Sequence, residues 1–264
     1  MVNPTRGVLY PARLPQFHRL PPPSAAAGLV EWFWIPEWDI EPGRASRQEI
    51  VAYPALNLVV DATSVTLAGA TTRASHRDLR GSGWAVGALL RPAAVAALID
   101  HPASLVDGER VLDDAVEGIA DLRAAISAAM SSGEGHREKA VEIFADWLVE
   151  RAAPVEHSAQ QANAAMDVLW GDGAALTPEE AATRLAVSVR TLQRMTHRHV
   201  GLPPAAVIRR RRLQEAAERV RESPETDLAS IAAELGYADH AHLTRDFRAV
   251  LGIAPRAYRS EVSS

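Results

Sequence analysis

Arginine side chains occur in two short segments of the C-terminal half, together with a glutamine in the first, and these side chains can read the edges of base pairs. Arg190, Gln193 and Arg194 come from the first segment, and Arg245 comes from the second. Arginine can donate two hydrogen bonds to O6 and N7 of guanine, and glutamine can make the equivalent pair with adenine. Each good pair discriminates against the wrong base by about 1–3 kcal/mol. The chemistry that these residues favour is recognition of double-stranded DNA.

Both segments belong to one pattern that occurs twice, 51 residues apart. In each copy an apolar residue is followed by an arginine two positions later, then by a core position, a glycine and a proline. The copies are Leu192, Arg194, Thr196, Gly201 and Pro204, then Leu243, Arg245, Phe247, Gly252 and Pro255. A short Ala-rich segment and a break precede each copy. A helix, a tight turn and a second helix with a polar outer face is the arrangement that places a helix in the major groove.

The starts of the expected helices carry capping residues. Thr177 can act as an N-cap, with Pro178 at the first helical position and Glu180 at the third, as in a capping box. Side chains of the same kind precede the other three helices, at Ser188, Asp227 and Asp239. The sequence therefore predicts two helix-turn-helix units with well-defined helix starts.

Residues 205–221 join the two units as an unbroken helical run without glycine or proline. At 1.5 Å per residue this connector spans roughly 26 Å, a length that can place two reading helices in successive major grooves about 34 Å apart. One chain could then occupy two adjacent half-sites. The run Arg209–Arg212 points around the helix axis, so we expect one or two of its arginines to reach DNA. The others would pair with Glu215, Glu218 or the acidic N-terminal half.

The ordered motifs around these residues resemble the DNA-binding domain of AraC/XylS-type transcription regulators over about residues 160–264. The resemblance implies that seven positions face the bases: Arg190, Gln193, Arg194, His240, Ala241, Thr244 and Arg245. We expect six further DNA contacts on the same elements: Ser188, Thr191, Arg198, Arg209, His242 and Arg248. One departure from the family pattern is Thr196, where phenylalanine is usual. We expect Met195, Val200 or the N-terminal domain to fill that space.

The residue pattern of the N-terminal half indicates a different kind of domain. Short runs rich in aromatic and branched residues predict strands at 29–35, 48–53, 56–60, 64–67 and 84–89. They favour a small antiparallel barrel or sandwich after an irregular, Pro-rich arm at 1–28. From about residue 92 the apolar spacing becomes helical. The fold class expected is α+β, with a regulatory domain at 1–155, β-rich to about residue 90, and a DNA-binding domain at 156–264.

The whole chain has a net charge of −5, and this charge is distributed unevenly between its two halves. Residues 174–264 hold 14 Arg and 11 acidic residues, whereas residues 1–173 hold 14 basic and 22 acidic residues. An acidic domain joined to a domain whose cations gather on one face accounts for this division.

The aromatic residues of the N-terminal half permit two interpretations, a domain core or the lining of a ligand pocket. The candidate ligand-binding residues are Trp32, Trp34, Glu49, Tyr53, Trp84 and Arg91. Residues 47–49, 54–60 and 87–92 resemble the uncharacterised N-terminal domain of actinobacterial regulators of this type, a resemblance that implies no particular ligand. The helices expected between Asp114 and Arg151 could pair with a second copy or pack on their own chain.

Composition excludes several classes of chemistry. The chain has no cysteine, so disulfides, a thiol nucleophile, a zinc finger and an alkyl-accepting repair protein are excluded. His197, His199, His240 and His242 lack a completing carboxylate cluster, so we expect surface or DNA-facing histidines and no metal. We expect no catalytic residues and no cofactor, because paired carboxylates, a nucleophile elbow and a phosphate loop are missing from residues 1–150.

The expected protein is a cytoplasmic, non-enzymatic regulator. Its expected partner is double-stranded DNA, with RNA polymerase, a small-molecule effector and a second copy as further partners and no membrane contact. The alternatives are an N-terminal ligand carrier or enzyme with an accessory helical module, and a protein-binding module that controls the helical half by contact alone.

Overall fold

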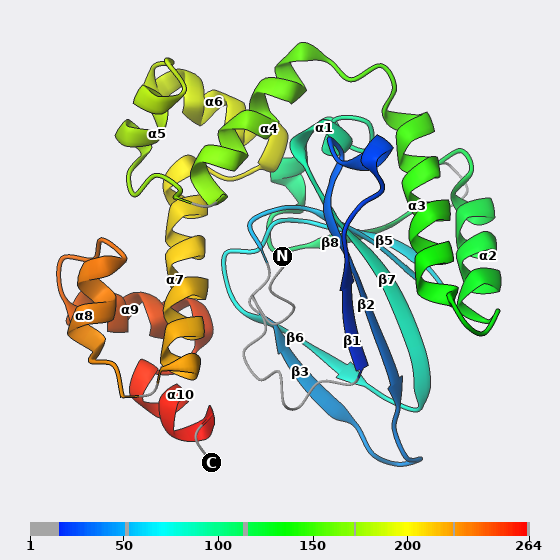
Figure 1. The fold of residues 1–264 in the computed structure, drawn as a ribbon, viewed down its shortest axis with the longest axis horizontal. Helices are drawn as coiled ribbons and strands as arrows, with labels where there is room; N and C mark the ends of the chain where they lie inside the picture. Colours follow the sequence, from blue (N-terminus) through cyan, green and yellow to red (C-terminus); the bar gives the residue numbers. More distant parts are fainter. Residues whose placement is uncertain (1–15, 51–52, 113–115, 172, 224, 263–264) are drawn as a thin grey trace.

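An antiparallel β-sheet lies between two groups of helices (Figure 1). The computed structural model describes residues 16–50, 53–112, 116–171, 173–223 and 225–262. The strands come from the N-terminal half and the last seven helices from residue 157 onward. This arrangement confirms the α+β class.

The strands form one six-stranded and one two-stranded antiparallel sheet. They are β1 (Gln16–Leu20), β2 (Val30–Asp39), β3 (Ser46–Ile50), β4 (Asn57–Asp61), β5 (Val65–Ala68), β6 (Ser75–Leu79), β7 (Ser82–Leu90) and β8 (Glu109–Leu112). The larger sheet has the order β1-β2-β7-β4-β5-β8, and β3 pairs with β6. The strands are antiparallel, as the sequence predicts. The larger sheet is open, with β1 and β8 at its edges, and does not close into a barrel.

Strand β1 lies inside the segment that the sequence predicts to be an irregular arm, so that prediction is wrong for residues 16–20. Five residues pair with β2, from Gln16 opposite Glu37 to Leu20 opposite Phe33. The ring of Phe17 stacks on Trp34 with centroids 6.5 Å apart. An edge strand next to prolines has a weak sequence pattern, because its partner strand supplies most of its stability. Residues 1–15 lie outside the described ranges.

The helices follow the expected positions closely. They are the short α1 (Pro92–Val95), then α2 (Ile119–Met130), α3 (His136–Ala152), α4 (His157–Trp170), α5 (Pro178–Arg184), α6 (Val189–Val200), α7 (Pro204–Glu222), α8 (Leu228–Glu234), α9 (His240–Leu251) and α10 (Pro255–Val262). The described residues also include two 3-10 turns, η2 (Ser24–Ala26) and η3 (Pro102–Leu105). None of the helices in the described ranges has the length and hydropathy that a membrane span requires.

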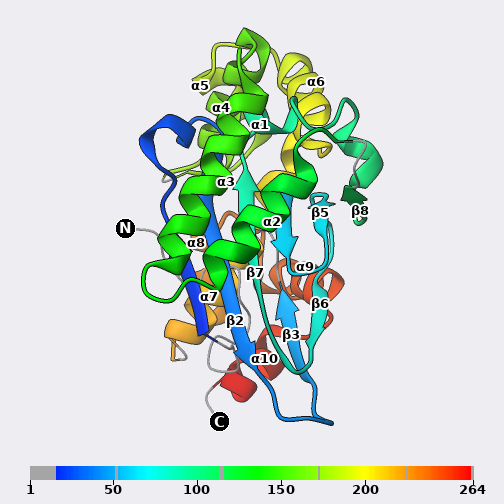
Figure 2. The same cartoon turned by 90° about the vertical axis from the view of Figure 1, so that its right-hand side faces the viewer.

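Helices α2 and α3 cover one face of the sheet and share its main core (Figure 2). Phe33 and Ile35 of β2 point into this core, where the Phe33 ring lies 5.5 Å from that of Phe144 on α3. Packing on their own chain therefore explains the apolar faces of these two helices without a second copy.

The opposite face of β2 and β7 belongs to a second core, which it shares with α4 and the first helix-turn-helix unit. Trp32 and Leu89 from the sheet join Leu192 and Val200 from α6 in this cluster. A third core lies within the second unit, between α7, α8, α9 and α10, and includes Phe247 and Tyr258. The first unit is thus built onto the N-terminal half, whereas the second unit has a core largely of its own.

Candidate nucleic-acid interface

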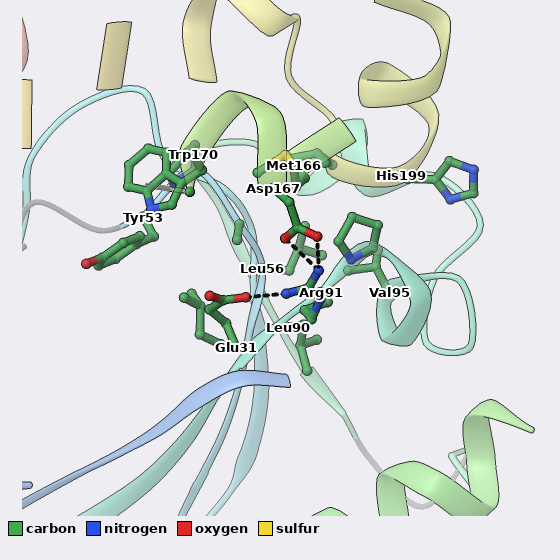
Figure 3. A pocket seen from close by; sticks show the side chains of 16 residues that line it. Glu31, Tyr53, Leu56, Leu90, Arg91, Val95, Met166, Asp167, Trp170 and His199 are labelled. Atoms are coloured by element: carbon green, nitrogen blue, oxygen red, sulfur yellow. Dashed lines mark hydrogen bonds and ion pairs between the residues drawn. The ribbon is translucent and has the colours of Figure 1, made fainter. Parts of the chain in front are cut away.

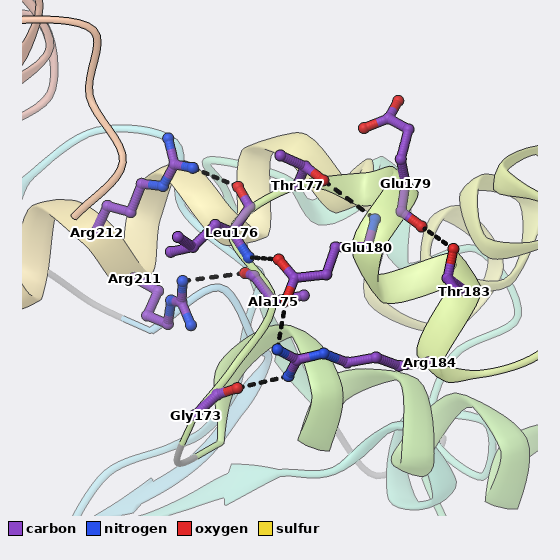
Figure 4. A network of polar contacts seen from close by, with 10 residues as sticks. All are labelled: Gly173, Ala175, Leu176, Thr177, Glu179, Glu180, Thr183, Arg184, Arg211 and Arg212. Atoms are coloured by element: carbon purple, nitrogen blue, oxygen red, sulfur yellow. Dashed lines mark hydrogen bonds and ion pairs between the residues drawn. The ribbon is translucent and has the colours of Figure 1, made fainter. Parts of the chain in front are cut away.

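The first helix-turn-helix unit consists of α5 and α6, and side chains cap the start of each helix. The Thr177 hydroxyl accepts a hydrogen bond from the backbone amide of Glu180 at 3.1 Å. The Glu180 carboxylate accepts from the amide of Leu176 at 2.8 Å and pairs with Arg184 (Figure 4). It therefore reaches one residue further back than in the expected capping box. The Ser188 hydroxyl accepts from the amide of Thr191 at 3.1 Å, as expected.

The outer face of α6 is polar and exposed. The exposed residues of α6 are Arg190, Gln193, Arg194, His197 and Arg198, while Leu192 and Val200 are buried. The Thr191 hydroxyl lies 2.9 Å from that of Ser188, so both residues belong to the cap. Alternation at helical spacing lets α6 bury one stripe and present the other to a partner.

Two further residues of α6 lie on its buried side. Thr196 is buried, and its hydroxyl donates to the carbonyl of Gln193 at 3.3 Å. Met195 and Val200 belong to the same core as the sheet residues Trp32 and Leu89. His199 is also buried, which corrects the expectation of a surface or DNA-facing histidine. Burial lowers its pKa.

The second unit consists of α8 and α9 and repeats the same construction. The Asp227 carboxylate accepts from the amide of Ala229 at 3.2 Å, and Asp239 accepts from the amide of His242 at 2.6 Å. This backbone hydrogen bond holds the pKa of Asp239 below its usual value. Five residues of α9 are exposed: His240, Ala241, Arg245, Arg248 and Ala249.

Two candidate residues of α9 are only partly exposed. Thr244 is half-buried. The ring of His242 packs edge-on against Tyr237, with centroids 5.2 Å apart and an interplanar angle of 89°. In Figure 2, α6 lies above α9 on the same side of the molecule. The two recognition helices are thus joined by one connector and lie on the same side of the molecule.

The four consecutive arginines of α7 have separate partners. Arg209 is exposed and pairs with Asp246 of α9 at 2.8 Å. Arg211 donates to the carbonyl of Ala175 at 3.1 Å, and Arg212 donates to that of Leu176 (Figure 4). Arg210 donates to Thr71 and to the carbonyl of Arg73 in the N-terminal half. Arg209 is exposed enough to contact DNA. The other three arginines bind groups elsewhere in the chain and so hold α7 in place.

These contacts add two backbone carbonyls, of Ala175 and Leu176, to the expected partners of the arginine run. Arg211 does approach Glu215, at 3.8 Å, as expected. Arg210 reaches the N-terminal half, as expected, and donates there to the Thr71 hydroxyl and the Arg73 carbonyl. The sequence shows that four consecutive arginines must point in different directions around the helix. It does not show which distant residues they bind.

A small cavity lies where the sheet, α4 and the end of α6 meet (Figure 3). Its volume is about 60 Å³, well below the roughly 300–1,000 Å³ of a typical ligand pocket. Arg91 spans it, donating to Glu31 at 2.7 Å and to Asp167 at 2.6 Å. Tyr53 and Trp170 line the same cavity, with their rings 4.9 Å apart.

The candidate ligand-binding residues of the N-terminal half are only partly brought together. Tyr53 and Arg91 line the cavity. Trp32 packs edge-on against Tyr53 in the core, and Trp34 donates its indole hydrogen to Asn57 at 3.0 Å. Trp84 packs against the main core. The backbone of Glu49 lies in β3, and its side chain is outside what the structure describes. Within the described ranges no cluster of histidine and carboxylate residues could hold a metal ion.

Two segments of the chain match known families. Residues 181–261 match a helix-turn-helix domain family, and residues 18–111 match a family described as a domain of unknown function. The two capped helix pairs on one connector, together with the first match, define a helix-turn-helix protein. Residues 181–261 form a helix-turn-helix domain of the AraC type.

Several curated relatives match a part of the chain. The transcriptional activator RhaS of Pectobacterium atrosepticum is 27% identical over 51% of this chain and 40% of its own length. RhaS of Escherichia fergusonii is 38% identical over 32% of this chain and 30% of its own. A protein of Streptomyces lividans named as AraC-like is 35% identical over 47% of this chain and 39% of its own. The chain thus covers less than half the length of these relatives.

Among solved structures, ToxT from Vibrio cholerae O395 aligns with 94% of this chain and 97% of its own. The TM-score is 0.39 and the sequence identity is 11%.

Proposed function

We propose that this protein is a sequence-specific DNA-binding transcription regulator. Each chain would insert α6 and α9 into adjacent major grooves of one duplex. The observation that carries the proposal is the pair of capped helices with exposed arginine and glutamine or histidine side chains, joined by one connector on one side of the molecule. The relatives named as transcription activators and regulators support it.

The residues divide by role. Arg190, Gln193 and Arg194 of α6 would read base edges, and His240 and Arg245 of α9 would contribute a second set. Ala241 offers only a methyl group, which can pack on thymine, so α9 would make fewer hydrogen bonds to bases than α6. Arg198, Arg209 and Arg248 would contact phosphates, which supply most of the affinity but little sequence choice.

The division of the chain is part of the proposal. Residues 1–155 would be the regulatory domain and residues 156–264 the DNA-binding domain. A small-molecule effector would act at the cavity that Arg91 spans, where Arg91 contacts Glu31 of β2 and Asp167 of α4. RNA polymerase, a second copy and a cytoplasmic setting complete the proposal. The protein would not be an enzyme; the alternative is an N-terminal ligand carrier or enzyme with an accessory helical module.

Selection of bound duplexes from a pool of random sequence tests DNA recognition directly. The full chain should enrich one motif with two halves about one helical turn apart. An unenriched pool, or binding that does not weaken as salt is raised, would contradict the proposal, because phosphate contacts release counterions.

Arg194→Ala provides the residue-level test. The variant should lose about 1–3 kcal/mol of binding to the enriched duplex and relax the base preference at one position. Its melting temperature should stay unchanged, because the side chain is exposed. Arg44→Ala, at a side chain that is 76% exposed in the N-terminal half, is the matched control and should bind like the parent. A reduced melting temperature with parental affinity would assign Arg194 to the fold instead.

Tryptophan fluorescence can separate a sensor from the alternatives. Trp170 lines the cavity and Trp32 packs beside it, so a metabolite that enters should change the emission. A response that also changes affinity for the enriched duplex supports ligand control. A response without any DNA effect favours a carrier or enzyme.

A further inference from the structure

Both recognition helices end against the N-terminal half. At the end of α6, Gly201 lies so close to η3 that a Cβ atom there would be 2.8 Å from the backbone nitrogen of Ala103. At the end of α9, the carbonyl of Val250 accepts a hydrogen bond from the amide of Ala74 at 2.7 Å. Two segments of the N-terminal half therefore contact the two ends: residues 69–74 and residues 102–108, together called the clip below.

Arg210 attaches the clip to the connector helix. Its side chain is 3% exposed, and its Nη2 donates to the Thr71 hydroxyl at 2.8 Å and to the Arg73 carbonyl at 2.9 Å. Burial lowers the pKa of Arg210 to about 10, with the Asp107 charge opposing the shift, so the guanidinium is protonated at neutral pH. A buried cation is tolerated only where neighbouring groups accept its hydrogen bonds, and these contacts hold α7 at a fixed place on the clip.

Asp107 joins the two segments of the clip to each other. Its carboxylate accepts from the amide of Thr72 at 2.6 Å and from the Thr72 hydroxyl at 2.5 Å. The backbone amide of Asp107 donates to the carbonyl of Ala70 at 3.1 Å. Burial acts to raise the pKa of Asp107, but the hydrogen bonds from Thr72 outweigh it and keep the pKa below its ordinary value. The carboxylate is therefore charged at neutral pH and braces the segment that Arg210 contacts.

The contacts form one continuous path. It runs from the end of α6 through η3 to Asp107, then through Thr72 and Arg73 to Arg210, and through Ala74 to the end of α9. The first unit shares a large core with the sheet, whereas the second unit takes in Ala74 from the N-terminal half. In Figure 1 α7 runs between the two units, so without the clip its own stiffness would have to fix the position of the second unit.

We infer that the clip fixes the separation and relative orientation of α6 and α9, with Arg210 and Asp107 as positioning residues that do not contact DNA. The inference concerns the protein alone; its consequence for DNA rests on the proposed function. Two helices that must enter grooves about 34 Å apart bind best when their spacing is set before binding. A chain with a loosened clip should keep each half-site contact but lose the gain from engaging both halves together.

Distance measurements between spin labels test the clip without DNA. The chain has no cysteine, so His197→Cys on α6 and Ala249→Cys on α9, both exposed, give one labelled pair. Arg210→Met should broaden and shift the distance distribution. The matched control is Arg219→Met on the same helix, where the lost partner is Glu234 of α8 within the second unit. The control should leave the distribution unchanged.

A second variant keeps the inference testable if Arg210→Met does not fold. Asp107 has φ 58°, a conformation that asparagine tolerates. Asp107→Asn therefore keeps the backbone and removes the charge and one acceptor. It should broaden the distribution in the same direction as Arg210→Met. Distributions that match the parent in both variants would overturn the inference.

Binding to DNA supplies the functional outcome. The probes are the duplex enriched by the full chain, the same duplex with one or two base pairs inserted between its halves, and a single half. Arg210→Met should bind the enriched duplex about tenfold more weakly, bind the single half like the parent, and discriminate less between spacings. An equal loss on the single half would show a general defect and contradict a positioning role. If the parent enriches no duplex, the proposed function fails, while the label distances still decide the inference.

Discussion

At the scale of single residues, Ser188 combines two roles that substitution can separate. Its hydroxyl caps α6 by accepting from the amide of Thr191, and it stands at the helix end that would approach a phosphate. Ser188→Ala should lower stability by about 1 kcal/mol because the amide loses its partner. For a chain of this size that corresponds to roughly 2–4 °C in melting temperature.

Ser188→Asp is the informative comparison for this cap. Aspartate is also a good N-cap and its charge is favourable at a helix N-terminus, so the melting temperature should match or exceed that of the parent. Binding to the enriched duplex should nevertheless weaken, because a carboxylate would face phosphates. Parental DNA affinity in Ser188→Asp would place this helix end away from the duplex.

At the scale of elements, the two recognition helices end in the same way but in different surroundings. Gly201 and Gly252 both adopt a positive φ, 85° and 75°, at the C-caps of α6 and α9. A side chain at Gly201 would meet the backbone of Ala103, whereas nothing lies within 4 Å of a Cβ at Gly252. Substitution of these two glycines therefore distinguishes two losses of stability: that from a side chain in a left-handed conformation, and that from a clash with Ala103.

Alanine at each of these glycines gives a matched prediction. Both variants should lose roughly 1–2 kcal/mol, the cost of a left-handed conformation with a side chain. Gly201→Ala should lose more, because backbone atoms on η3 cannot move aside as a flexible side chain can. Denaturant unfolding of the two variants measures the difference. Equal losses would mean that η3 yields freely to the end of α6.

Local patterns in the sequence were enough to predict these elements but not their partners. Thr177, Ser188 and Asp239 cap the helices that the sequence predicts, because an N-cap and its helix are neighbours in the chain. The contact between Arg210 and Thr71 joins residues 139 positions apart, and no local pattern encodes it. The sequence does not predict strands β6 and β8 for a related reason. Their side chains are mostly polar and exposed, so only their pairing with another strand identifies them.

In the candidate site, too, some residues could be predicted from local sequence and others could not. The exposed faces of α6 and α9 follow from helical periodicity, so Arg194 and Arg245 were predictable. The burial of His199 depends on packing against the N-terminal half, and the ion pairs of Arg91 depend on α4 lying beside the sheet. Both require knowledge of how the domains meet.

At the scale of the whole molecule, the three cores predict how the chain opens. The first unit shares a core with Trp32 and Leu89 of the sheet, while the second unit is built around Phe247 and Tyr258. Cooperative opening follows contiguous buried contacts. The second unit should therefore open separately, and α5 and α6 should open together with the sheet and α4.

Hydrogen exchange on the full chain measures this division, and two core substitutions sharpen it. Leu89→Ala should cost about 2–5 kcal/mol in the shared core and speed exchange in α6 as well as in the sheet, while α9 exchanges as before. Leu228→Ala, in the core of the second unit, should speed exchange in α9 and spare α6. If Leu89→Ala leaves α6 protected, or if either substitution loosens both recognition helices equally, the two units belong to one cooperative body. The N-terminal half would then hold both to the same degree, and the different construction of the two cores would have no consequence for how the helices are released.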